Sequence, residues 1–497
     1  PGPVCPLSIH GNASEDAMRK TIYLVSILTL TLAACSGDDG DAPASESADG
    51  SAAAASGEVT CKAFKSPCVA IAAGDTSALL DAVNLLEDGA TVVLAEGTWK
   101  LDNQVTIRKA KNVTLIGQGI DKSVLSFADQ KVQSNGVDVI GDGIRVEGLT
   151  IEDAKKDALR IENSKGVTIR AVKVTWTKGA LTENGAYGIY PVRCYDVLME
   201  KCEAYNASDA GLYIGQSINV IVRDNIAKRN VAGIEIENTQ YADVYGNLAE
   251  DNTAGLAVFD LPGNPVIGRD IYVHDNIIRA NNRANFASSG TVSEVPAGTG
   301  TFILASRRVE LANNTYKNNR TVNIAVLNGL AIKPKKSKWR LAKDKLVGSI
   351  EGLDLPSDAT GVSNYYTSDI YIHDNSHSGS GKDADSKGPL TRPLGFLVKV
   401  IYAEERIDDI LYDTWGESSF DPVDPTKNSN DNRLCISNEK GATFVSLDLP
   451  TQLKLADKFK FSKLSELYRP KAPFVPFNCA TLKGGPIAKV SLPQAGK

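Results

Sequence analysis

Gly211-Leu212-Tyr213-Ile214, Gly233-Ile234-Glu235-Ile236 and Gly255-Leu256-Ala257-Val258 repeat one short pattern three times, at intervals of 22 residues. Each copy is a glycine, an aliphatic residue, a variable residue and a second aliphatic residue, which is the alternation typical of a β-strand. A second series of strands lies between these copies and ends at Asn225 and Asn247, which are also 22 residues apart. A repeat of this length is too short for a pair of helices and fits one coil of a stacked β-solenoid.

The repeat continues far beyond this stretch. From Val105 to Leu330 the pattern is nearly unbroken, which corresponds to roughly ten coils if each coil takes 22–23 residues. Strands of four or five residues cannot bury an apolar face alone, so each coil packs on its neighbours at a spacing of about 4.8 Å. The sequence therefore predicts an all-β chain whose residues 104–385 form a parallel β-helix.

Both ends of such a solenoid expose core residues and unpaired strands, so caps are expected. At the N-terminal side, residues 59–103 contain apolar residues at helical spacing after Asp75 or Thr76, which act as the helix N-cap. At the other end, residues 386–497 are predicted to be an irregular cap that begins with a helix from Leu394 to Leu411.

The spacing between repeats widens at three places, near residues 175–186, 261–269 and 284–300. These insertions are expected to leave the solenoid as loops on one face, where solenoids usually bind their ligands. In contrast, one coil position repeatedly carries asparagine, which tolerates a left-handed turn and stacks amide on amide along the axis. The stacked residues are Asn225, Asn247, Asn276, Asn314 and Asn375, and this column is interpreted as structural.

Composition and hydropathy argue against two classes of protein, those that bind nucleic acids and those that span a membrane with a helix. The 497 residues carry a net charge of −6, which argues against a nucleic-acid-binding protein, since such proteins present a basic face. Aromatic residues make up only 6 %, in keeping with the narrow aliphatic interior of a solenoid. Beyond the N-terminal region there is no apolar run of 18 residues, so no membrane-spanning helix is expected.

The N-terminal region carries an export signal. Met18-Arg19-Lys20 is a start with a basic segment, Thr21 to Leu32 is apolar, and Leu32-Ala33-Ala34-Cys35 ends the segment. This ending resembles the lipobox of bacterial lipoproteins, which implies lipidation of Cys35; the alternative is an ordinary cleaved signal.

The resemblance implies a signal peptide over residues 18–34 and attachment to the membrane by the lipid alone. Ser36 implies an outer-membrane protein that faces the periplasm or the cell surface. Residues 35–58 are a low-complexity, flexible tether, and residues 1–17 are interpreted as an over-extended start.

Six cysteines remain when Cys5 and Cys35 are set aside, and an even number in an exported chain suggests disulfides. Locality favours three pairs, although the sequence does not prove the connectivity. The pairs are Cys61–Cys68, Cys194–Cys202 and Cys435–Cys479.

Two families are resembled. The N-terminal helix followed by "DGATVVLAEGTWKL" resembles the start of right-handed parallel β-helix proteins of the pectate-lyase-like class. The segments "VFDLPGNP", "IYVHDN", "IYIHDN", "NRLCI" and "PFNCATL" resemble a family of bacterial parallel β-helix repeat lipoproteins, over roughly Gly57 to the end. That resemblance implies a right-handed helix and a partner exported protein, and it supplies no assigned catalytic residues.

Candidate functional residues follow from the alternation of the strands, which directs Ile189, Leu212, Ile234 and Leu256 inward and the residues between them outward. The first outward column is Arg160, Tyr190, Tyr213, Glu235 and Ala257, and the second is Glu162, Val192, Gly215, Glu237 and Phe259. The third is Asn163, Arg193, Gln216, Asn238 and Asp260. Tyrosine rings, arginines and carboxylates on a flat sheet suit a sugar chain, whereas the alternative is an ordinary solvated face.

If the face is catalytic, lyase or C5-epimerase chemistry fits it, because a base removes a proton beside a carboxylate that a cation must neutralise. The candidates for acid or base are Tyr190, Tyr213 and Glu235, with Glu237 and Asp260 as alternatives. Arg193 or Arg160 is the candidate neutralising group. Candidate binding residues are Arg160, Gln216, Glu237, Asn238, Phe259, Asp260 and His274. No metal site is assigned, although Glu235, Glu237 and Asp260 are candidate Ca²⁺ ligands.

Two further features are left open. His274-Asp275 is a candidate base, but the recurrence of the same dipeptide at His373-Asp374 favours a structural role. The lysine-rich segment 333–345 can bind acidic polysaccharide or lipid phosphate, or be a solvated loop. Two functions are therefore predicted: binding and processing of an acidic polysaccharide, or a non-catalytic scaffold that docks a partner envelope protein.

Overall fold

The computed structural model describes residues 59–65, 67–108, 110–385, 393–403, 405–416, 424, 427–450 and 476–493. The segments predicted as over-extended start, signal peptide and tether, together with Cys35, lie outside these residues. Among the described helices, none combines the length and apolar character that a bilayer-spanning segment needs.

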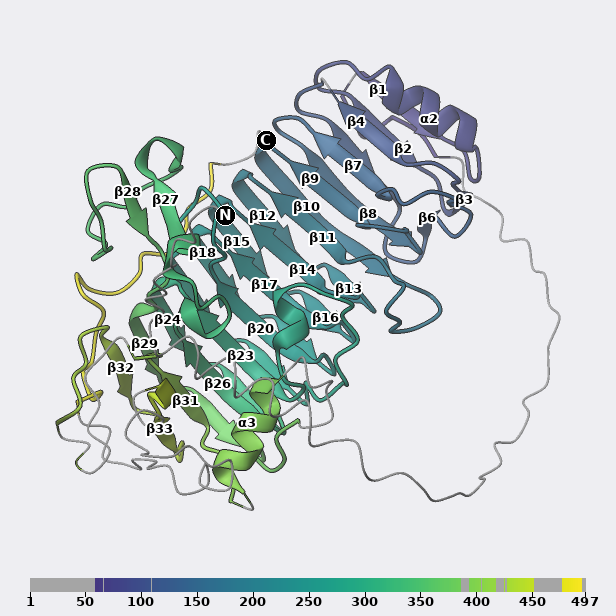
Figure 1. Cartoon of the computed structure of the whole chain (residues 1–497). Helices are drawn as coiled ribbons and strands as arrows, with labels where there is room; N and C mark the ends of the chain where they lie inside the picture. The colour runs from purple at the N-terminus through teal and green to yellow at the C-terminus, as the bar shows by residue number, and fades with distance from the viewer. Residues whose placement is uncertain are drawn as a thin grey trace, which may run out of the picture. The chain divides into compact units, whose positions relative to one another are not determined.

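One sheet, which we call sheet B, takes one strand from each coil (Figure 1). Its neighbouring strands pair in parallel throughout. The eleven strands are β4 (Val105–Arg108), β7 (Val137–Ile140), β9 (Leu159–Glu162), β11 (Tyr187–Val192), β14 (Ala210–Gly215), β17 (Ala232–Glu237), β20 (Ala254–Phe259), β23 (Thr299–Leu304), β26 (Val322–Leu327), β31 (Ile410–Asp413) and β33 (Phe444–Ser446).

The second sheet, sheet A, forms the other walls of the coil and is also parallel. One series of its strands is β1 (Cys68–Ile71), β2 (Thr91–Leu94), β5 (Thr114–Ile116), β8 (Arg145–Glu152), β10 (Lys165–Thr175), β12 (Tyr195–Glu200), β15 (Ile218–Arg223), β18 (Gln240–Tyr245), β21 (Arg269–His274), β24 (Arg307–Ala312), β29 (Ser368–His373) and β32 (Leu434–Ser437). The companion strands are β3 (Gly97–Lys100), β6 (Ser123–Ser126), β13 (Glu203–Tyr205), β16 (Ile226–Lys228), β19 (Leu248–Glu250), β22 (Ile277–Arg279), β25 (Thr315–Lys317) and β30 (Ser376–Ser378).

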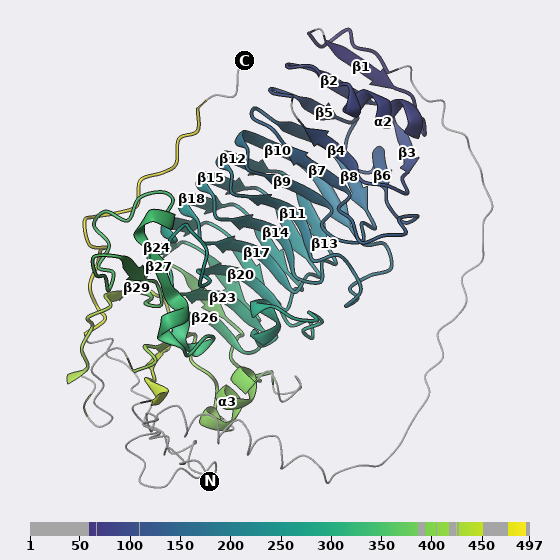
Figure 2. The ribbon, with the colours of Figure 1, turned by 45° about the horizontal axis from the view of Figure 1, so that its top comes forward.

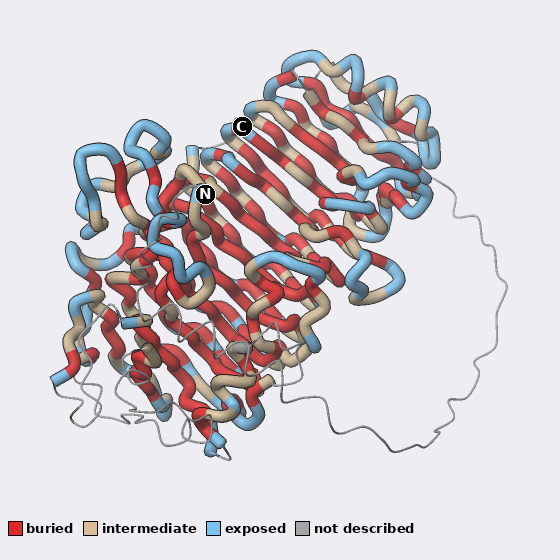
Figure 3. Tube along the Cα trace, in the orientation of Figure 1, coloured by how far each residue is buried: buried red, intermediate tan, exposed pale blue. Residues whose placement is uncertain are grey.

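The predicted register is confirmed. Leu212 pairs with Ile234, and Ile234 with Leu256, and all three side chains are buried in the core. Figure 3 shows the buried residues along the strands and the exposed ones in the loops that leave the coils. The fold is therefore the expected solenoid of about ten coils, in which each coil covers the apolar face of the next.

The asparagine column is also confirmed. The amide nitrogen of Asn225 donates to the amide oxygen of Asn247 at 2.9 Å, and the bonds continue through Asn276 and Asn314 to Asn375. A second ladder, which the sequence analysis did not identify, joins Asn230, Asn252, Asn281 and Asn319 at 3.0–3.2 Å. These buried amides are fully engaged in holding the coils together, so they are structural.

The N-terminal cap is the helix α2 (Thr76–Asn84), whose N-cap carboxylate on Asp75 accepts from the Ala78 amide at 2.9 Å. At the C-terminal end the helix is shorter than predicted. α3 spans Pro393–Tyr402 and stops at Ala403, which has a positive φ of 49°. The prediction of helix up to Leu411 is wrong because residues 410–413 form β31 and extend sheet B.

Two insertions rise from the coils in front of sheet B (Figure 1). The first, residues 284–298, contains the 3₁₀ turn η1 (Thr291–Glu294). The second, residues 329–366, contains η2 (Gly329–Ala331), η3 (Lys336–Trp339), η4 (Lys343–Lys345) and the antiparallel hairpin of β27 (Arg340–Ala342) and β28 (Gly361–Ser363). The widening near residue 284 was predicted, whereas the second insertion follows the last predicted continuous coil.

Of the three predicted disulfides, Cys61–Cys68 and Cys435–Cys479 are present. The pair Cys194–Cys202 is wrong, because both thiols are free and buried. The strand β12 lies between them, and eight extended residues span roughly 26 Å, far more than a disulfide bridges. Burial raises the pKa of each thiol to about 12, so neither is reactive.

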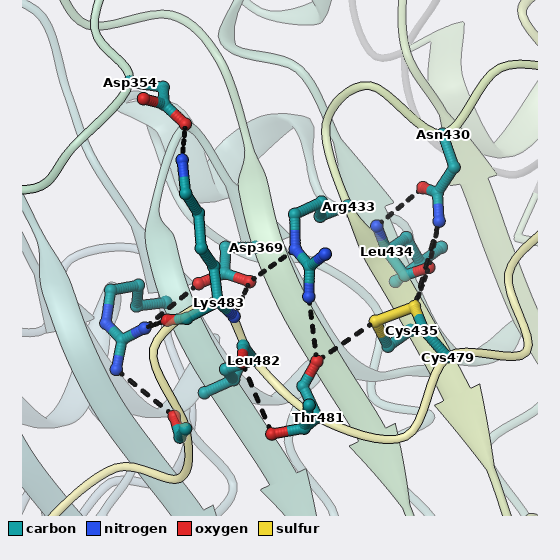
Figure 4. Close-up of polar contacts among 12 residues, drawn as sticks. Asp354, Asp369, Asn430, Arg433, Leu434, Cys435, Cys479, Thr481, Leu482 and Lys483 are labelled. Atoms are coloured by element: carbon teal, nitrogen blue, oxygen red, sulfur yellow. Dashed lines mark hydrogen bonds and ion pairs between the residues drawn. A yellow bond between two sulfur atoms is a disulfide. The ribbon is translucent and has the colours of Figure 1, made fainter.

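The last described segment, residues 476–493, contacts the outer edge of sheet A (Figure 2). Figure 4 shows its attachment beside the Cys435–Cys479 disulfide. The Lys483 amide donates to Asp369 at 2.8 Å, and Arg433 donates to the Thr481 carbonyl at 3.1 Å. The C-terminal cap is thus secured by one covalent bond and by charged side chains of the coil.

Candidate functional site

The three columns predicted from the sequence lie on the outer face of sheet B, in the expected order. Tyr190 pairs with Arg160 on the preceding coil, and Tyr213 pairs with Glu235 on the following coil. Gly215 pairs with Glu237, which in turn pairs with Phe259. The alternation of the strands therefore identified which side chains leave the core.

The expectation that all of these side chains face solvent is wrong. Arg160, Tyr190 and Gln216 are half-buried and Arg193 is exposed, whereas Tyr213 and Glu235 are 3 % and 1 % exposed. Glu237, Asn238, Phe259 and Asp260 are also buried. Alternation places a side chain outside the coil, but it does not reveal what an insertion later lays over it.

The first insertion covers the start of the face. Phe286, Ala287 and Val292 pack against a group of three tyrosines, Tyr187, Tyr190 and Tyr213. The ring centroids of the tyrosines lie 4.5–4.7 Å from one another, so the rings contact each other directly. This packed group leaves Tyr190 as a half-exposed ring at its margin.

Four carboxyl groups gather beside the tyrosines, and we call Asp157, Asp209, Glu235 and Glu237 the acid cluster. Burial raises the pKa of Asp157 to about 6 and that of Glu237 to about 7. Burial and the nearby Glu237 raise the pKa of Asp209 to about 7. Burial, Asp209 and Glu237 raise the pKa of Glu235 well above its usual value. The cluster therefore holds protons at neutral pH, as in sites that carry out acid–base chemistry.

Two members of the cluster differ in their hydrogen bonding. Oε1 of Glu235 is buried and has no hydrogen-bond partner among the described residues. Glu237 accepts from the Asn264 amide at 2.7 Å and is also hydrogen-bonded by Tyr213. The Tyr213 ring lies so close to Gly215 that a Cβ at position 215 would overlap the ring and its hydroxyl. Glycine at 215 thus allows Tyr213 to reach Glu237.

A pair of arginines stands at the open side of the cluster. Arg160 on β9 and Arg193 after β11 both form ion pairs with Glu162, which leaves one net positive charge on the group. The Arg193 side chain is 47 % exposed. Arg160 lies 6.0 Å from the centroid of the Tyr190 ring, and its Nε has no partner among the described residues. We call Arg160 and Arg193, together with the Glu162 that joins them, the arginine pair.

Three predicted binding residues hold loops instead: Asn238 holds the loop at residues 261–266, and Phe259 and Asp260 hold the second insertion. Asn238 accepts from the Leu261 amide at 2.8 Å and donates to the Val266 carbonyl at 2.8 Å. Phe259 packs in a cluster that includes Trp339 and Tyr365. Asp260 accepts from the Asn364 amide at 2.8 Å and lies near the buried guanidinium of Arg307. These side chains anchor loops, so they are not available to a ligand.

His274 lies on sheet A and is not part of the site. Its ring stacks on Tyr272 at 4.0 Å, and its two nitrogens lie 2.9 Å from Asp243 and 2.6 Å from Asp275. His373 repeats the arrangement with Tyr371, Glu310 and Asp374. His274 pairs with Tyr245, away from the columns of sheet B, and the recurrence of the dipeptide reflects a repeated ring stack.

Within the described residues, no group of three or more His, Cys, Asp or Glu side chains is arranged to hold a metal ion. The candidate Ca²⁺ role of Glu235, Glu237 and Asp260 therefore receives no support from the geometry. Asp260 and Glu235 are instead separated into two different polar groups, one at the second insertion and one in the acid cluster.

Two cavities lie over later coils of the same sheet. One, of about 120 Å³, lies where the two insertions meet α3 and is lined by Thr291, Glu294, Lys333 and Leu394. The other, of about 70 Å³, is apolar and is lined by residues of α3 and by Phe302, Ala325 and Leu411. Neither is lined by the acid cluster, so we place the chemistry at the cluster on the basis of its charges and not of cavity size.

Sequence analysis missed three members of the site, Asp157, Asp209 and Tyr187. The two aspartates carry a signal that was available: each stands directly before the alanine that leads into a sheet B strand, at Ala158 and at Ala210. Their raised pKa values depend on burial by distant segments, which no local pattern reports.

Comparison with known proteins agrees with the fold. The family model described as "Right handed beta helix region" matches residues 105–271 and 180–337. Comparison with curated proteins finds no match.

Solved structures with a similar fold include the A-module of the Azotobacter vinelandii mannuronan C-5 epimerase AlgE4, at 14 % identity and a TM-score of 0.39, covering 62 % of this chain and 86 % of that one. An exopolygalacturonase from Thermotoga maritima matches at 13 % identity and a TM-score of 0.37, covering 64 % and 88 %. An alginate lyase from Paenibacillus sp. str. FPU-7 matches at 15 % identity and a TM-score of 0.36, covering 63 % and 94 %. At such low identities the similarity concerns only the course of the backbone. The family match, over residues 105–337, and the parallel register of the coils agree that this chain folds as a right-handed parallel β-helix.

Proposed function

We propose that this protein binds an acidic polysaccharide at the arginine pair and transfers a proton to and from it through the adjoining margin of the acid cluster. The observation that supports this most is the contact between two different environments. Arg160 and Arg193 carry exposed or half-buried positive charge. Arg160 acts electrostatically on Asp157, whose pKa of about 6 lies near neutrality, as does the pKa of about 7 of Asp209 in the same cluster.

Binding of a uronate follows from the charges. A guanidinium group binds a carboxylate through two parallel hydrogen bonds, and Arg193 is free on the side away from Glu162 to do so. The half-exposed Tyr190 ring offers a surface against which a pyranose ring can pack. Gln216, on the next coil, adds amide donors and acceptors for hydroxyl groups.

The roles differ from those expected from the sequence. Asp209 is half-buried and its pKa of about 7 lies near neutrality, which suits a general base. Burial raises the pKa of Tyr190 to about 12, so its phenol stays protonated and suits a general acid. Tyr213 and Glu235 are covered and support these groups from behind.

The proton balance is that of a lyase or a C5-epimerase. In the lyase case Asp209 takes the proton from C5, a double bond forms between C4 and C5, the C4–O bond breaks, and Tyr190 gives its proton to the departing oxygen. In the epimerase case Asp209 keeps the proton taken from one face of C5, and Tyr190 gives its proton to the opposite face. In both, an arginine carries the negative charge that develops on the carboxylate.

The test uses polygalacturonate and alginate as ligands and substrates. Arg193→Gln is expected to weaken binding about tenfold or more, because a charge-assisted pair is lost. Asp209→Asn and Tyr190→Phe are expected to retain binding and lose formation of unsaturated or epimerised product. Tyr272→Phe on sheet A is the matched control, since its ring lies on the other sheet. If the unmodified protein binds neither polymer, the proposal fails.

One observation favours a second function, a scaffold that docks a partner exported protein. Ile226, Leu248 and Ile277 lie in register on three successive coils of sheet A, and Ile277 is 43 % exposed. Aligned apolar side chains on a flat surface are typical of a docking surface. Pull-down of an envelope protein that Ile277→Ser abolishes, with no turnover of either polymer, would favour this function.

We also propose that Cys35 is lipidated and anchors the protein to the bacterial envelope, through the lipid alone. The basic, apolar and small-small-Cys order of residues 18–35 supports it. Metabolic labelling with a fatty acid is expected to mark the protein, and Cys35→Ser is expected to abolish the label. Labelling that survives this change would contradict the anchor.

A further inference from the structure

The second insertion carries a run of positively charged side chains on a protein that is acidic overall. Residues 333–345 contain six lysines and Arg340 against Asp344 alone, whereas the whole chain carries a net charge of −6. All six lysines are exposed. In the described part of the chain, Lys333, Lys335, Lys338 and Lys343 make no ion pair, and Lys345 lies 3.7 Å from Asp344.

These lysines stand on an ordered support. The Trp339 side chain is fully buried, its indole nitrogen donates to the Lys333 carbonyl at 2.9 Å, and its ring packs against Gly329. The hairpin β27–β28 follows directly. A fully buried tryptophan in the middle of the lysine run fixes the backbone, so the lysines occupy a defined part of the surface.

The insertion is attached to the same edge of the solenoid as the arginine pair. Val347 forms a parallel bridge with Val266, and the Gln240 side chain exchanges two hydrogen bonds of 2.9 Å with the backbone of Ser349. Along that edge Arg193, Gln216 and Asn238 follow one another on successive coils, and each is in the left-handed conformation. Gln240 comes two residues after Asn238.

The distance along the solenoid between Arg193 and Gln240 follows from the coil spacing. The coil of Arg193 and the coil of Gln240 are two steps apart, which is about 10 Å at roughly 4.8 Å a step. Half-exposed Gln216 occupies the step between them. A chain that lies along this edge therefore meets a guanidinium first, then an amide, and then the point where the insertion that carries the lysines joins the solenoid.

From this arrangement we infer that residues 333–345 are a second anion-binding subsite for the same acidic polysaccharide, so that the protein prefers long chains to short ones. This inference rests on the proposed function and adds the length of its ligand. A short uronate reaches only the arginine pair, whereas a longer chain also reaches the lysines and gains affinity by binding both at once.

A lipid headgroup is the competing source of negative charge, because lysine clusters also bind anionic membranes. The polysaccharide is favoured because the insertion that carries the lysines joins the edge that carries Arg193 and Gln216. Lys333 also lines the cleft between the two insertions, together with Thr291 and Glu294. This placement continues a row of ligand-binding side chains on the body of the solenoid.

The test compares the protein with the variant Lys335→Ser/Lys338→Ser/Lys343→Ser and with the control Lys62→Ser/Lys111→Ser/Lys131→Ser. The control lysines are also exposed and make no ion pair in the described residues. Binding of oligogalacturonates of increasing length, at two salt concentrations, is measured for each. We expect the triple variant to bind the polymer about tenfold more weakly or worse, with a smaller salt dependence. Dimers and trimers should bind it as they bind the unmodified protein.

Three outcomes would overturn the inference. The first is equal loss in the control variant, which would show a general charge effect. The second is polymer affinity unchanged in the triple variant while binding to vesicles of anionic phospholipid falls, which would assign the lysines to a membrane. The third is affinity in the unmodified protein that does not rise with chain length. If instead no uronate of any length binds, the proposed function fails with it, and the two failures are thereby distinguished.

Discussion

At the scale of single residues, the raised pKa values of the acid cluster make the stability of the fold depend on pH. The pKa of Glu237 rises from 4.5 to about 7 on folding, chiefly by burial. The native state thus binds a proton that the unfolded state has released between these pH values. The free energy of unfolding therefore falls as pH rises from about 4.5 to about 7, by roughly 3 kcal/mol for this group.

Glu237→Gln is expected to remove this dependence. The variant should be more stable than the unmodified protein at pH 8 and similar to it at pH 4.5, as measured by urea unfolding at both pH values. Glu250→Gln is the opposite control, because Lys228 and Arg279 lower the pKa of Glu250. That carboxylate stabilises the fold above its unfolded pKa, so its loss should cost stability at pH 8 and not at low pH. Parallel pH profiles for the Glu237 variant and the unmodified protein would contradict the account.

Gly215 is predicted to be required for the position of Tyr213. A methyl group at 215 overlaps the Tyr213 ring, so Gly215→Ala should displace the phenol from Glu237 and cost about 1–3 kcal/mol of stability. In a Tyr213→Ala background the same change should cost little. A double-mutant cycle of unfolding free energies measures the difference, and equal costs in both backgrounds would show that the clash lies elsewhere.

At the scale of elements, the histidine stacks of sheet A join successive coils. Burial lowers the pKa of His274, but hydrogen bonds to Asp243 and Asp275 outweigh it, so the pKa is raised. The groups that face the ring are these two carboxylates with Tyr245 and Tyr272. Because the folded pKa is raised, the stabilisation is fully present below the unfolded value of about 6.5 and is lost as pH rises through the folded pKa.

His274→Gln should therefore be less stable than the unmodified protein at pH 6, with the difference shrinking at high pH. Asp275→Asn should lower the pKa of His274, which NMR titration of the ring measures directly. A His274 variant that loses the same stability at every pH would indicate that only the packing of the ring matters.

Elements also show where sequence reasoning succeeds. The 22-residue period predicts the coil, the register and the asparagine ladder, because each depends only on residues within one coil and its neighbour. The prediction of a disulfide between Cys194 and Cys202 fails, because closeness in sequence does not show that a strand holds the thiols apart. Sequence reasoning fails again for Ile410 and Leu411, which pair with β26 instead of continuing the predicted helix.

At the scale of the whole molecule, the candidate site is made by segments distant in sequence. Tyr213 and Glu235 stand outside the coil as predicted, but residues 284–298, some 70 to 110 positions beyond the tyrosines, bury them. That covering decides which carboxyl groups keep their protons, and therefore which side chains act. No period in the sequence reports it, so the outward columns could be predicted and their chemical state could not.

The C-terminal cap is predicted to depend on Cys435–Cys479, which closes a loop of 44 residues. Cys435→Ser/Cys479→Ser should make residues 476–493 sensitive to protease and lower stability by about 2–4 kcal/mol. The charged contacts in Figure 4 remain, so the coils should keep their circular dichroism. Cys61→Ser/Cys68→Ser is the matched control, since it should affect only the N-terminal cap. A tail that stays protected in the first variant would show that Asp369 and Arg433 hold it unaided.

The central claim is that an acidic polysaccharide binds the arginine pair on sheet B, and hydroxyl-radical footprinting tests it most directly. Tyr190 and Tyr272 are both half-buried and lie on opposite sheets, so each reports one face of the solenoid. With saturating polygalacturonate or alginate, the account predicts that oxidation of Tyr190 falls while oxidation of Tyr272 is unchanged. Unchanged oxidation of Tyr190, or equal protection of both tyrosines, would contradict it.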